Sequence, residues 1–329
     1  MFRGDYMSRV PVFILSGFLG SGKTTLLKRM LLASHKKGLK PAILMNELGS
    51  TDTDGQIISE GSNDILEKLL DGCICCSKKN EVVSCIENLL IQNPDVVFIE
   101  LTGVANPEEV VDSITEPQLI DKLYVEKIIT ILDSENILEY NSILAADKVI
   151  VETNRRQIEV ADMLVMNKID LITSSKKEKI EKMIKKHNGS SPIYYTSYSD
   201  IDVDSLYVNL KPVKRKTMMI RIGKEKAVHH HHHHNQNSSF SRINTISIPI
   251  KQVTSTKVIE KFLKKWQPNL LRAKGYVPIK DQTLLMQSVI KRTTWEATNY
   301  EGDYYLVLIG INLDEANIKR EWEQCLVVK

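Results

Sequence analysis

The chain has 329 residues, of which 42% are hydrophobic and 26% are charged, and its formal net charge is only +3. This length suggests two domains with buried cores, and the small net charge argues against nucleic acid or an anionic membrane as a partner. No apolar run reaches the roughly 18 residues needed to cross a bilayer, and the odd count of five cysteines favours reduced thiols. We therefore expect a cytoplasmic protein.

Strand-like and helix-like patterns alternate through the first part of the chain. Short apolar runs predict buried strands at residues 10–15, 42–45, 95–100, 127–132, 163–166 and 192–195. Apolar residues recur at helical spacing between them, first at Leu26, Leu27, Met30 and Leu31, and later at Val82, Val83, Ile86, Leu89 and Leu90. The alternation predicts the α/β class with a doubly wound, mostly parallel sheet, which binds ligands at the carboxyl ends of its strands.

The first predicted strand runs into the sequence GFLGSGKTT, residues 17–25. This sequence fits the phosphate-binding P-loop pattern G-x-x-x-x-G-K-[ST] in its required context between a strand and a helix. Backbone amides of such a loop surround phosphates, the lysine neutralises the β and γ oxygens, and the threonine hydroxyl binds Mg²⁺. The predicted nucleotide-binding residues of this loop are Gly17, Gly20, Ser21, Gly22, Lys23, Thr24 and Thr25.

A long polar stretch follows at residues 49–64, and its length favours a functional loop over a simple connection. The next apolar strand then ends in the sequence DVVFIELTG, which places Glu100 where a Walker B carboxylate would hold magnesium. The alternative is an ordinary surface acid at the end of a strand. Gly103 would offer its amide to the γ-phosphate. We predict that Lys23, Thr24 and Glu100 are catalytic and that Thr24 and Glu100 bind magnesium.

The sequence MNKIDL, residues 166–171, has the N-K-x-D spacing with which many GTPases recognise guanine. Asp170 would accept hydrogen bonds from the guanine N1–H and 2-amino group, while Lys168 stacks on the base and Asn167 braces the loop. Adenine would leave that carboxylate without partners, at a cost of about 1 to 3 kcal/mol. GTP is therefore the predicted nucleotide. Residues 196–198 either contact the base edge or form an ordinary turn.

Three thiols gather in the sequence DGCICCSKK, at Cys73, Cys75 and Cys76. Thiols near the start of a helix ionise readily, which suits metal binding. Zn²⁺ commonly takes four nitrogen, sulfur or oxygen ligands, whereas this cluster offers two or three. Glu47 or Asp54 is the candidate for a further ligand. The alternatives are a redox pair formed by Cys73 and Cys75, or thiols packed in a core.

A polar segment at residues 223–241 predicts a linker between two domains. The segment contains an unbroken histidine run equal in length to a common affinity tag, but it lies inside the chain. We interpret the run as an auxiliary metal-collecting segment. Its members are His229, His230, His231, His232, His233 and His234.

Beyond the linker the pattern changes to that of a smaller α+β domain. Strands are predicted at residues 243–250, 270–279, 283–290, 292–298 and 304–312, and helices near 254–265 and 314–325. The predicted division is a nucleotide-binding domain at residues 1–215, a histidine-rich linker at 216–241 and a C-terminal domain at 242–329.

Taken together, the motifs GFLGSGKTTLL, NELG, GCICC, ELTGVANP, NKIDL, the histidine linker and LRAKGY resemble the CobW-like family of P-loop GTPases. That family includes zinc-regulated metallochaperones. The resemblance implies a nucleotide-binding domain followed by a smaller CobW C-terminal domain. It implies GTP hydrolysis coupled to delivery of zinc, cobalt or a similar divalent metal to a client. It further implies that Cys73, Cys75 and Cys76 bind the metal and that Glu47 is the acid of the first switch.

The chain departs from the family pattern at two positions. Leu48 stands where the family usually has phenylalanine, and Ser50 stands where it has an acid, while Asp54 falls where a family aspartate is expected. The missing acid leaves open both the fourth metal ligand and the metal preference.

We hypothesise that the loop from residue 46 to about 71 is a switch, so that GTP with Mg²⁺ tightens metal binding and hydrolysis loosens it. The expected partners are a guanine nucleotide, a divalent metal and a client metalloprotein, with self-association left open. Three alternatives remain: a metal-storage or metal-sensing protein with a vestigial nucleotide site, a small-molecule kinase, and a nickel-insertion maturation GTPase.

Overall fold

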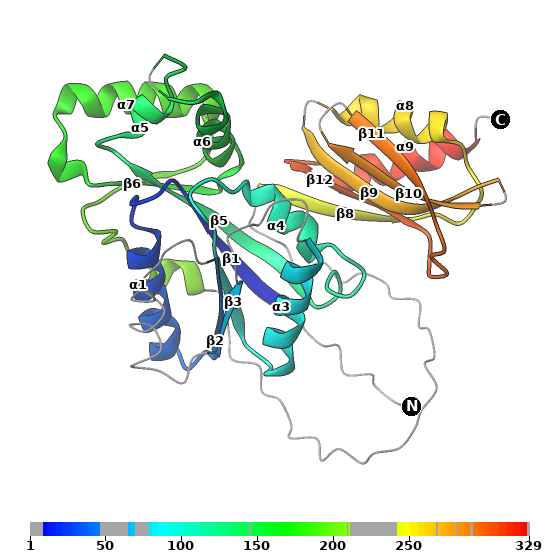
Figure 1. The fold of residues 1–329 in the computed structure, drawn as a ribbon, viewed down its shortest axis with the longest axis horizontal. Helices are drawn as coiled ribbons and strands as arrows, with labels where there is room; N and C mark the ends of the chain where they lie inside the picture. The colour runs from blue at the N-terminus through cyan, green and yellow to red at the C-terminus, as the bar shows by residue number, and fades with distance from the viewer. Residues whose placement is uncertain are drawn as a thin grey trace, which may run out of the picture.

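The computed structural model describes residues 9–46, 65–69, 79–144, 146–208, 210, 242–267, 269–280, 282–289 and 292–327. Within these residues the strands form two separate sheets, one of seven strands and one of five (Figure 1). In this part of the chain, no helix combines the length and the apolar character needed to span a membrane.

The larger sheet has the strand order β3-β2-β4-β1-β5-β6-β7, and every neighbouring pair is parallel. Its strands are β1 (Val10–Ser16), β2 (Pro41–Asn46), β3 (Ile65–Leu69), β4 (Val96–Glu100), β5 (Leu123–Asp133), β6 (Met163–Asn167) and β7 (Ile193–Tyr195). Every residue of β1, β4 and β6 is buried, as expected for parallel strands covered on both faces. The predicted doubly wound fold is confirmed.

Strand β3 was not predicted, because its residues lie inside the segment that we expected to be a switch loop. It pairs in parallel with β2, from Ala42 opposite Ile65 to Asn46 opposite Leu69. Its sequence, ILEKL, has neither a continuous apolar run nor strict alternation. A short strand at the edge of a sheet needs only one neighbour, so its sequence pattern is weak.

Helices cover both faces of the larger sheet. They are α1 (Lys23–Lys36), α3 (Lys79–Ile91), α4 (Pro107–Ile114), α5 (Ile137–Tyr140), α6 (Lys148–Val160) and α7 (Ser174–His187), with the short helices η1 (Ile169–Leu171) and η2 (Asp204–Tyr207). Alternate residues of β1 belong to different cores: Phe13 and Leu15 pack with α1, whereas Val12 and Ile14 pack with α3 and α4. Because side chains alternate between the two faces of a strand, the buried residues of β1 contribute to two layers. Figure 1 shows α1 on one side of the sheet and α3 and α4 on the other.

The smaller sheet is antiparallel, with the strand order β11-β10-β9-β12-β8. Its elements are β8 (Ile243–Pro249), α8 (Thr256–Trp266), β9 (Leu270–Ile279), β10 (Gln282–Val289), β11 (Arg292–Thr298), β12 (Tyr305–Ile311) and α9 (Glu315–Val327). Leu306 and Leu308 face the core that contains α8 and α9, whereas Val307 and Ile309 belong to the core of the larger sheet. The predicted α+β architecture is confirmed, and its second face is buried against the first domain.

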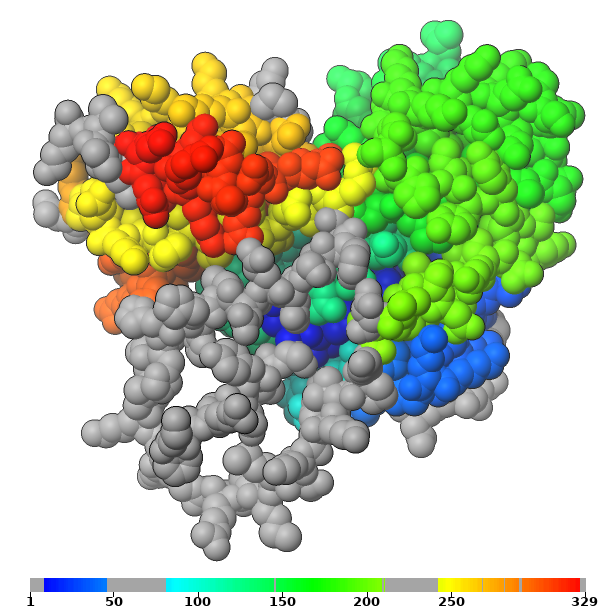
Figure 2. Space-filling model, turned by 180° about the vertical axis from the view of Figure 1, so that it is seen from behind, coloured from blue at the N-terminus to red at the C-terminus, as the bar shows by residue number. Residues whose placement is uncertain are grey.

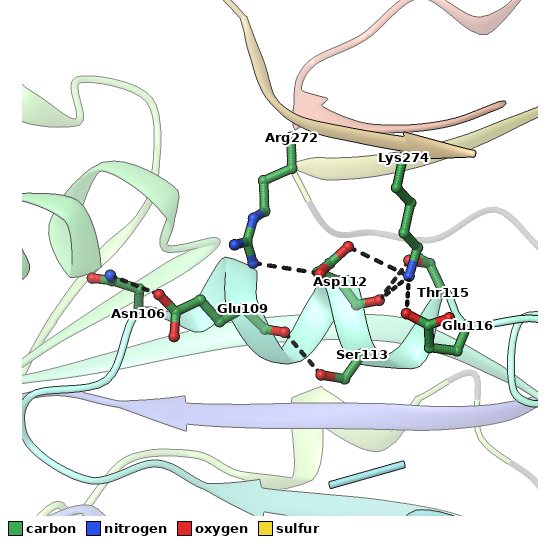
Figure 3. Close-up of polar contacts among 8 residues, drawn as sticks. All are labelled: Asn106, Glu109, Asp112, Ser113, Thr115, Glu116, Arg272 and Lys274. Carbon is green, nitrogen blue, oxygen red and sulfur yellow. Dashed lines mark hydrogen bonds and ion pairs between the residues drawn. The ribbon is translucent and has the colours of Figure 1, made fainter. Parts of the chain in front are cut away.

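The contact between the two domains centres on α4 and β9. The Lys274 ammonium lies 2.9 Å from a Glu116 carboxylate oxygen and 3.4 Å from one of Asp112. Arg272 lies 3.5 Å from the other Asp112 oxygen, so Asp112 sits between the two cations (Figure 3). Lys274 is only 6% exposed, so this is a buried network of opposite charges rather than a solvated surface pair.

A second polar contact fixes the start of the C-terminal domain. The Arg242 guanidinium donates to Asn188 Oδ1 at 2.6 Å, to Ser191 Oγ at 3.0 Å and to the Ala161 carbonyl at 3.2 Å. Its backbone amide donates to the Asp162 carboxylate. The carbonyl belongs to Ala161, the C-cap of α6, and a cation is favourable at the C-terminal end of a helix. In Figure 2 the yellow surface of the C-terminal domain accordingly adjoins the green surface of the first domain.

Candidate functional site

The P-loop connects β1 to α1 at the central strand of the larger sheet. Its three glycines with positive φ angles are Gly17, Gly20 and Gly22. Gly22 is the N-cap of α1 with φ 108°, and no side-chain cap hydrogen bond is formed there by the residues that the structure describes. A Cβ atom on Gly22 would lie 2.4 Å from Asn167 Nδ2, so only glycine fits there. The first amides of α1 therefore keep the orientation that binds an anion at a helix N-terminus.

Lys23 folds back over the P-loop. It is 7% exposed, and its ammonium donates to the carbonyl of Gly17 at 2.9 Å and to that of Phe18 at 3.1 Å. Burial lowers the pKa of Lys23 below its usual value, and nearby Glu100 partly offsets that effect. The buried hydroxyls of Ser16 and Ser21 have no hydrogen-bond partner within the described residues. The loop and the end of β1 thus hold a buried cation and two such hydroxyls, while Thr25 is exposed in the first turn of α1.

The two predicted magnesium ligands lie in direct contact. The Thr24 hydroxyl donates to Glu100 Oε1 at 2.8 Å, and Glu100 is 8% exposed at the end of β4. A hydroxyl oxygen and a carboxylate oxygen at this distance are the hard ligands that Mg²⁺ accepts, usually together with water and phosphate oxygens. The residues present therefore fit the ion.

The loop after β4 is held between the P-loop and α6. A Cβ atom on Gly103 would lie 2.6 Å from the Leu19 backbone nitrogen, so this glycine allows the two loops to touch. From α6, Gln157 Nε2 donates to the carbonyls of Gly103 at 3.1 Å and of Ala105 at 2.9 Å. Gly103 therefore lies beside the P-loop, and its contact with the γ-phosphate stays a prediction.

The N-K-x-D tetrapeptide begins at the end of β6, and neighbouring loops hold its side chains. Asn167 Nδ2 donates to the Ser21 carbonyl at 2.8 Å, and Asn167 Oδ1 accepts from the Ser199 amide at 2.9 Å. Asn167 thus ties the P-loop to the loop after β7. The Ser197 hydroxyl donates to the Asp170 carboxylate, so the segment that we left open as base loop or plain turn contacts the predicted guanine-reading acid.

The sequence did not identify Asp133 as part of this site. Asp133 ends β5, and its Oδ2 lies 2.8 Å from the Lys168 ammonium. Its position at the end of a predicted strand could have identified it, because an acid at the carboxyl end of a parallel strand lies at the ligand-binding edge of the sheet. Ser199 has no comparable signal, because its contact with Asn167 runs through its backbone amide.

The predicted metal site lies outside the described residues. This applies to Cys73, Cys75, Cys76, Glu47, Asp54 and the run from His229 to His234. Among the residues that the structure describes, no group of three or more His, Cys, Asp or Glu side chains is placed to hold a metal ion. The two described thiols, Cys85 and Cys325, are half-buried and pack against hydrophobic cores.

Comparison with protein-family models gives two matches. Residues 11–195 match the model described as "CobW/HypB/UreG, nucleotide-binding domain". Residues 243–326 match the model described as "Cobalamin synthesis protein cobW C-terminal domain". The first match alone covers more than half of the 329 residues.

Curated proteins give similar results. The zinc-regulated GTPase metalloprotein activator 1 of Saccharomyces cerevisiae is 34% identical over 218 residues, which are 60% of this chain and 50% of that protein. The zinc chaperone YjiA of Escherichia coli is 28% identical over 327 residues, which are 95% of this chain and 98% of that protein. The chain thus spans about half of the yeast protein and nearly all of the bacterial one.

Among solved structures, the Zn(II)-bound YjiA GTPase from E. coli matches over 97% of this chain and 99% of that chain. The sequence identity is 22% and the TM-score is 0.47.

Proposed function

This chain belongs to the CobW/HypB/UreG family of P-loop GTPases, and we propose that it is a metallochaperone that hydrolyses GTP to deliver a divalent metal to a client metalloprotein. Zinc is the proposed cargo, because curated relatives are named as a zinc chaperone and as a zinc-regulated GTPase metalloprotein activator. Cobalt is the alternative ion. We also propose a cytoplasmic location, where the three thiols of the GCxCC motif would stay reduced.

The observation that carries the GTPase proposal is the meeting of three motifs at one edge of the sheet. Thr24 of the P-loop contacts Glu100 at 2.8 Å, and Asn167 of the guanine motif contacts the P-loop carbonyl of Ser21 at 2.8 Å. The residues proposed to bind the phosphates, the magnesium ion and the base are therefore close enough together to contact one bound nucleotide. A bare P-loop would also suit a kinase, but the added guanine motif favours a GTPase.

We assign the following roles to the residues of this site. The amides of the P-loop and the Lys23 ammonium bind the β- and γ-phosphates. Asp170 accepts from the guanine N1–H and 2-amino group, and Asn167 holds the base loop against the P-loop. Thr24 and Glu100 hold Mg²⁺, which when bound neutralises charge that develops on the phosphates. Gly103 brings its loop close enough to the P-loop to offer an amide to the terminal phosphate.

We further propose that nucleotide and cargo are coupled. Cys73, Cys75 and Cys76 would bind zinc as thiolates, with Glu47 or Asp54 as an added ligand when GTP is bound, and the histidine run would collect ions nearby. A coupling of about 1 to 3 kcal/mol corresponds to a change in metal affinity of about 5- to 150-fold. Linkage is reciprocal, so bound zinc must tighten GTP binding by the same factor.

The decisive experiment measures zinc affinity by competition with a chromophoric chelator. The full chain is titrated with GDP and with a non-hydrolysable GTP analogue, and the analogue should tighten zinc binding by about 5- to 150-fold. Equal zinc affinities with GDP and with the analogue would contradict the coupling and favour a metal-storage or metal-sensing protein. Replacing Cys73, Cys75 and Cys76 together by serine should abolish the tight site, whereas the matched control Cys325→Ser should keep it.

A separate test addresses the base. Asp170→Asn exchanges an acceptor for an amide that can donate to a 2-oxo group, so it should weaken GTP binding and favour xanthosine triphosphate. Comparable affinity of the unmodified chain for GTP and ATP would contradict guanine recognition.

A further inference from the structure

Lys168 and Asp133 form an ion pair that the proposed roles do not yet use. The Lys168 ammonium lies 2.8 Å from Asp133 Oδ2, and the two side chains are 31% and 4% exposed. Lys168 has a φ angle of 62°, in the left-handed region that residues other than glycine seldom adopt. Such a conformation persists where the surrounding structure enforces it.

Asp133 is itself fixed by its own turn. Its Oδ1 accepts from the Glu135 amide at 3.0 Å, and its Oδ2 accepts from Asn136 Nδ2 at 3.1 Å. The parallel register of β5 and β6 places Asp133 opposite Asn167, the residue before Lys168. Two hydrogen bonds therefore hold the carboxylate in place, and the pairing of β5 with β6 puts it beside the start of the guanine motif.

The three base-recognition side chains are each held by a neighbour. Asn167 is held by Ser21 and Ser199, and Asp170 is held by Ser197. Lys168 has the longest and most flexible side chain of the three, and ordering a free lysine costs conformational entropy when a ligand binds. A partner that orders it beforehand would remove that cost.

We propose that Asp133 is a positioning residue for guanine recognition. It holds the Lys168 ammonium so that the aliphatic part of the lysine side chain is already placed to stack on the guanine ring. The inference rests on the proposed guanine-binding role of the N-K-x-D motif. Asp133 acts through Lys168 and does not touch the nucleotide. Its loss should therefore weaken binding of the base and leave binding of the phosphates unchanged.

The experiment uses the full chain and compares the affinities for GDP and for inorganic tripolyphosphate, which lacks a base. Asp133→Asn keeps an oxygen acceptor for the Glu135 amide but removes the charge that holds Lys168. GDP binding should weaken about tenfold, the effect of one contact of ordinary strength, while tripolyphosphate binding stays unchanged. The matched control is Asp204→Asn, whose carboxylate makes an exposed ion pair with Lys37 at 3.7 Å; it should bind both ligands normally.

A second variant separates the effect of the ion pair from the effect of the apolar part of the lysine side chain. Lys168→Met keeps an apolar side chain of similar length but cannot pair with Asp133, so it should lose GDP affinity to the same extent as Asp133→Asn. Combining both changes should cost no more than either alone, because the two residues act as one unit. If Asp133→Asn does not fold, as shown by thermal unfolding, Lys168→Met alone decides the question.

The inference is overturned if Asp133→Asn binds GDP normally, if it loses tripolyphosphate affinity equally, or if Lys168→Met keeps normal GDP affinity. Additive losses in the double variant overturn it as well. These outcomes differ from failure of the proposed function, which would appear as equal affinities of the unmodified chain for GDP and ADP.

Discussion

The Thr24 hydroxyl donates to the Glu100 carboxylate at 2.8 Å, although the two residues are 76 positions apart in the sequence. The contact depends on strand order, because β4 lies directly beside β1 and its Glu100 pairs with Leu15. The acid thereby reaches the helix that starts at Lys23. Two motifs that lie far apart in the sequence therefore meet at one edge of the fold, where we propose that they hold magnesium.

The first prediction concerns this contact. Thr24→Ala should lower magnesium-dependent GTP hydrolysis roughly 10- to 100-fold, the usual loss when a metal ligand or its supporting group is removed. Thr24→Ser keeps the hydroxyl and should retain most of the activity. Turnover measured over a range of magnesium concentrations tests both variants. If alanine and serine behave alike, the hydroxyl does not act on magnesium.

The second prediction concerns the contact between the P-loop and the loop after β4. Gly103→Ala would place a Cβ atom 2.6 Å from the Leu19 backbone nitrogen, a separation that forces one loop to move. GTP affinity and turnover should both fall, because the P-loop changes shape. Gly189→Ala is the matched control, since its added Cβ atom would lie 3.5 Å from the Lys185 carbonyl, an ordinary contact. Equal turnover in the two variants would show that the loops tolerate the shift.

The fold class, the family and GTPase membership could be predicted from the sequence, and each is confirmed. The reason is that their signals are local: the P-loop pattern spans eight consecutive residues, and each buried strand is one apolar run. The site residues beyond these motifs depend on long-range register. Asp133 lies 35 positions before Lys168, and only the pairing of β5 with β6 brings them together.

The domain contact was harder to predict for a different reason. The run YLVLIGI of β12 is apolar at successive positions, which indicates a strand buried on both faces, yet it does not say what covers the second face. The position of Lys274 gave no signal, because its partners Asp112 and Glu116 belong to another domain. Burial of a charged residue follows from its partners and cannot be predicted from its own sequence neighbourhood.

The third prediction concerns the pH dependence of stability. Glu126 is 6% exposed and lies in β5 at the register irregularity opposite Val12 and Phe13. Burial raises its pKa above 4.5, and the Lys127 charge partly offsets this. The folded state therefore keeps a proton that the unfolded state loses, so the stabilising contribution is complete below about pH 4.5 and is lost as the pH rises through the folded-state pKa.

Glu126→Gln mimics the protonated side chain at every pH. It should raise the melting temperature near pH 8 by a few degrees, which corresponds to about 1 kcal/mol, and the gain should shrink as the pH falls towards 4.5. Melting curves between pH 4.5 and 8 test this, with the exposed Glu152→Gln as the control. A gain that stays constant with pH would show that Glu126 acts through packing and not through its charge.

The last prediction concerns the ion pairs between the domains. Lys274→Ala should reduce the free energy of unfolding by about 3 kcal/mol, because removing one member of a buried charge network leaves the opposite charges poorly compensated. Lys265→Ala is the matched control, since Lys265 is half-exposed and its pair with Glu321 spans 3.2 Å; such a surface pair contributes at most about 1 kcal/mol. Denaturant unfolding followed by fluorescence measures both variants.

Added salt should weaken the Lys265 pair more than the Lys274 network, because solvent ions screen exposed charges most effectively. Equal destabilisation by the two alanines, with equal salt dependence, would mean that Lys274 contributes no more than a surface residue and that apolar packing of β12 holds the domains together.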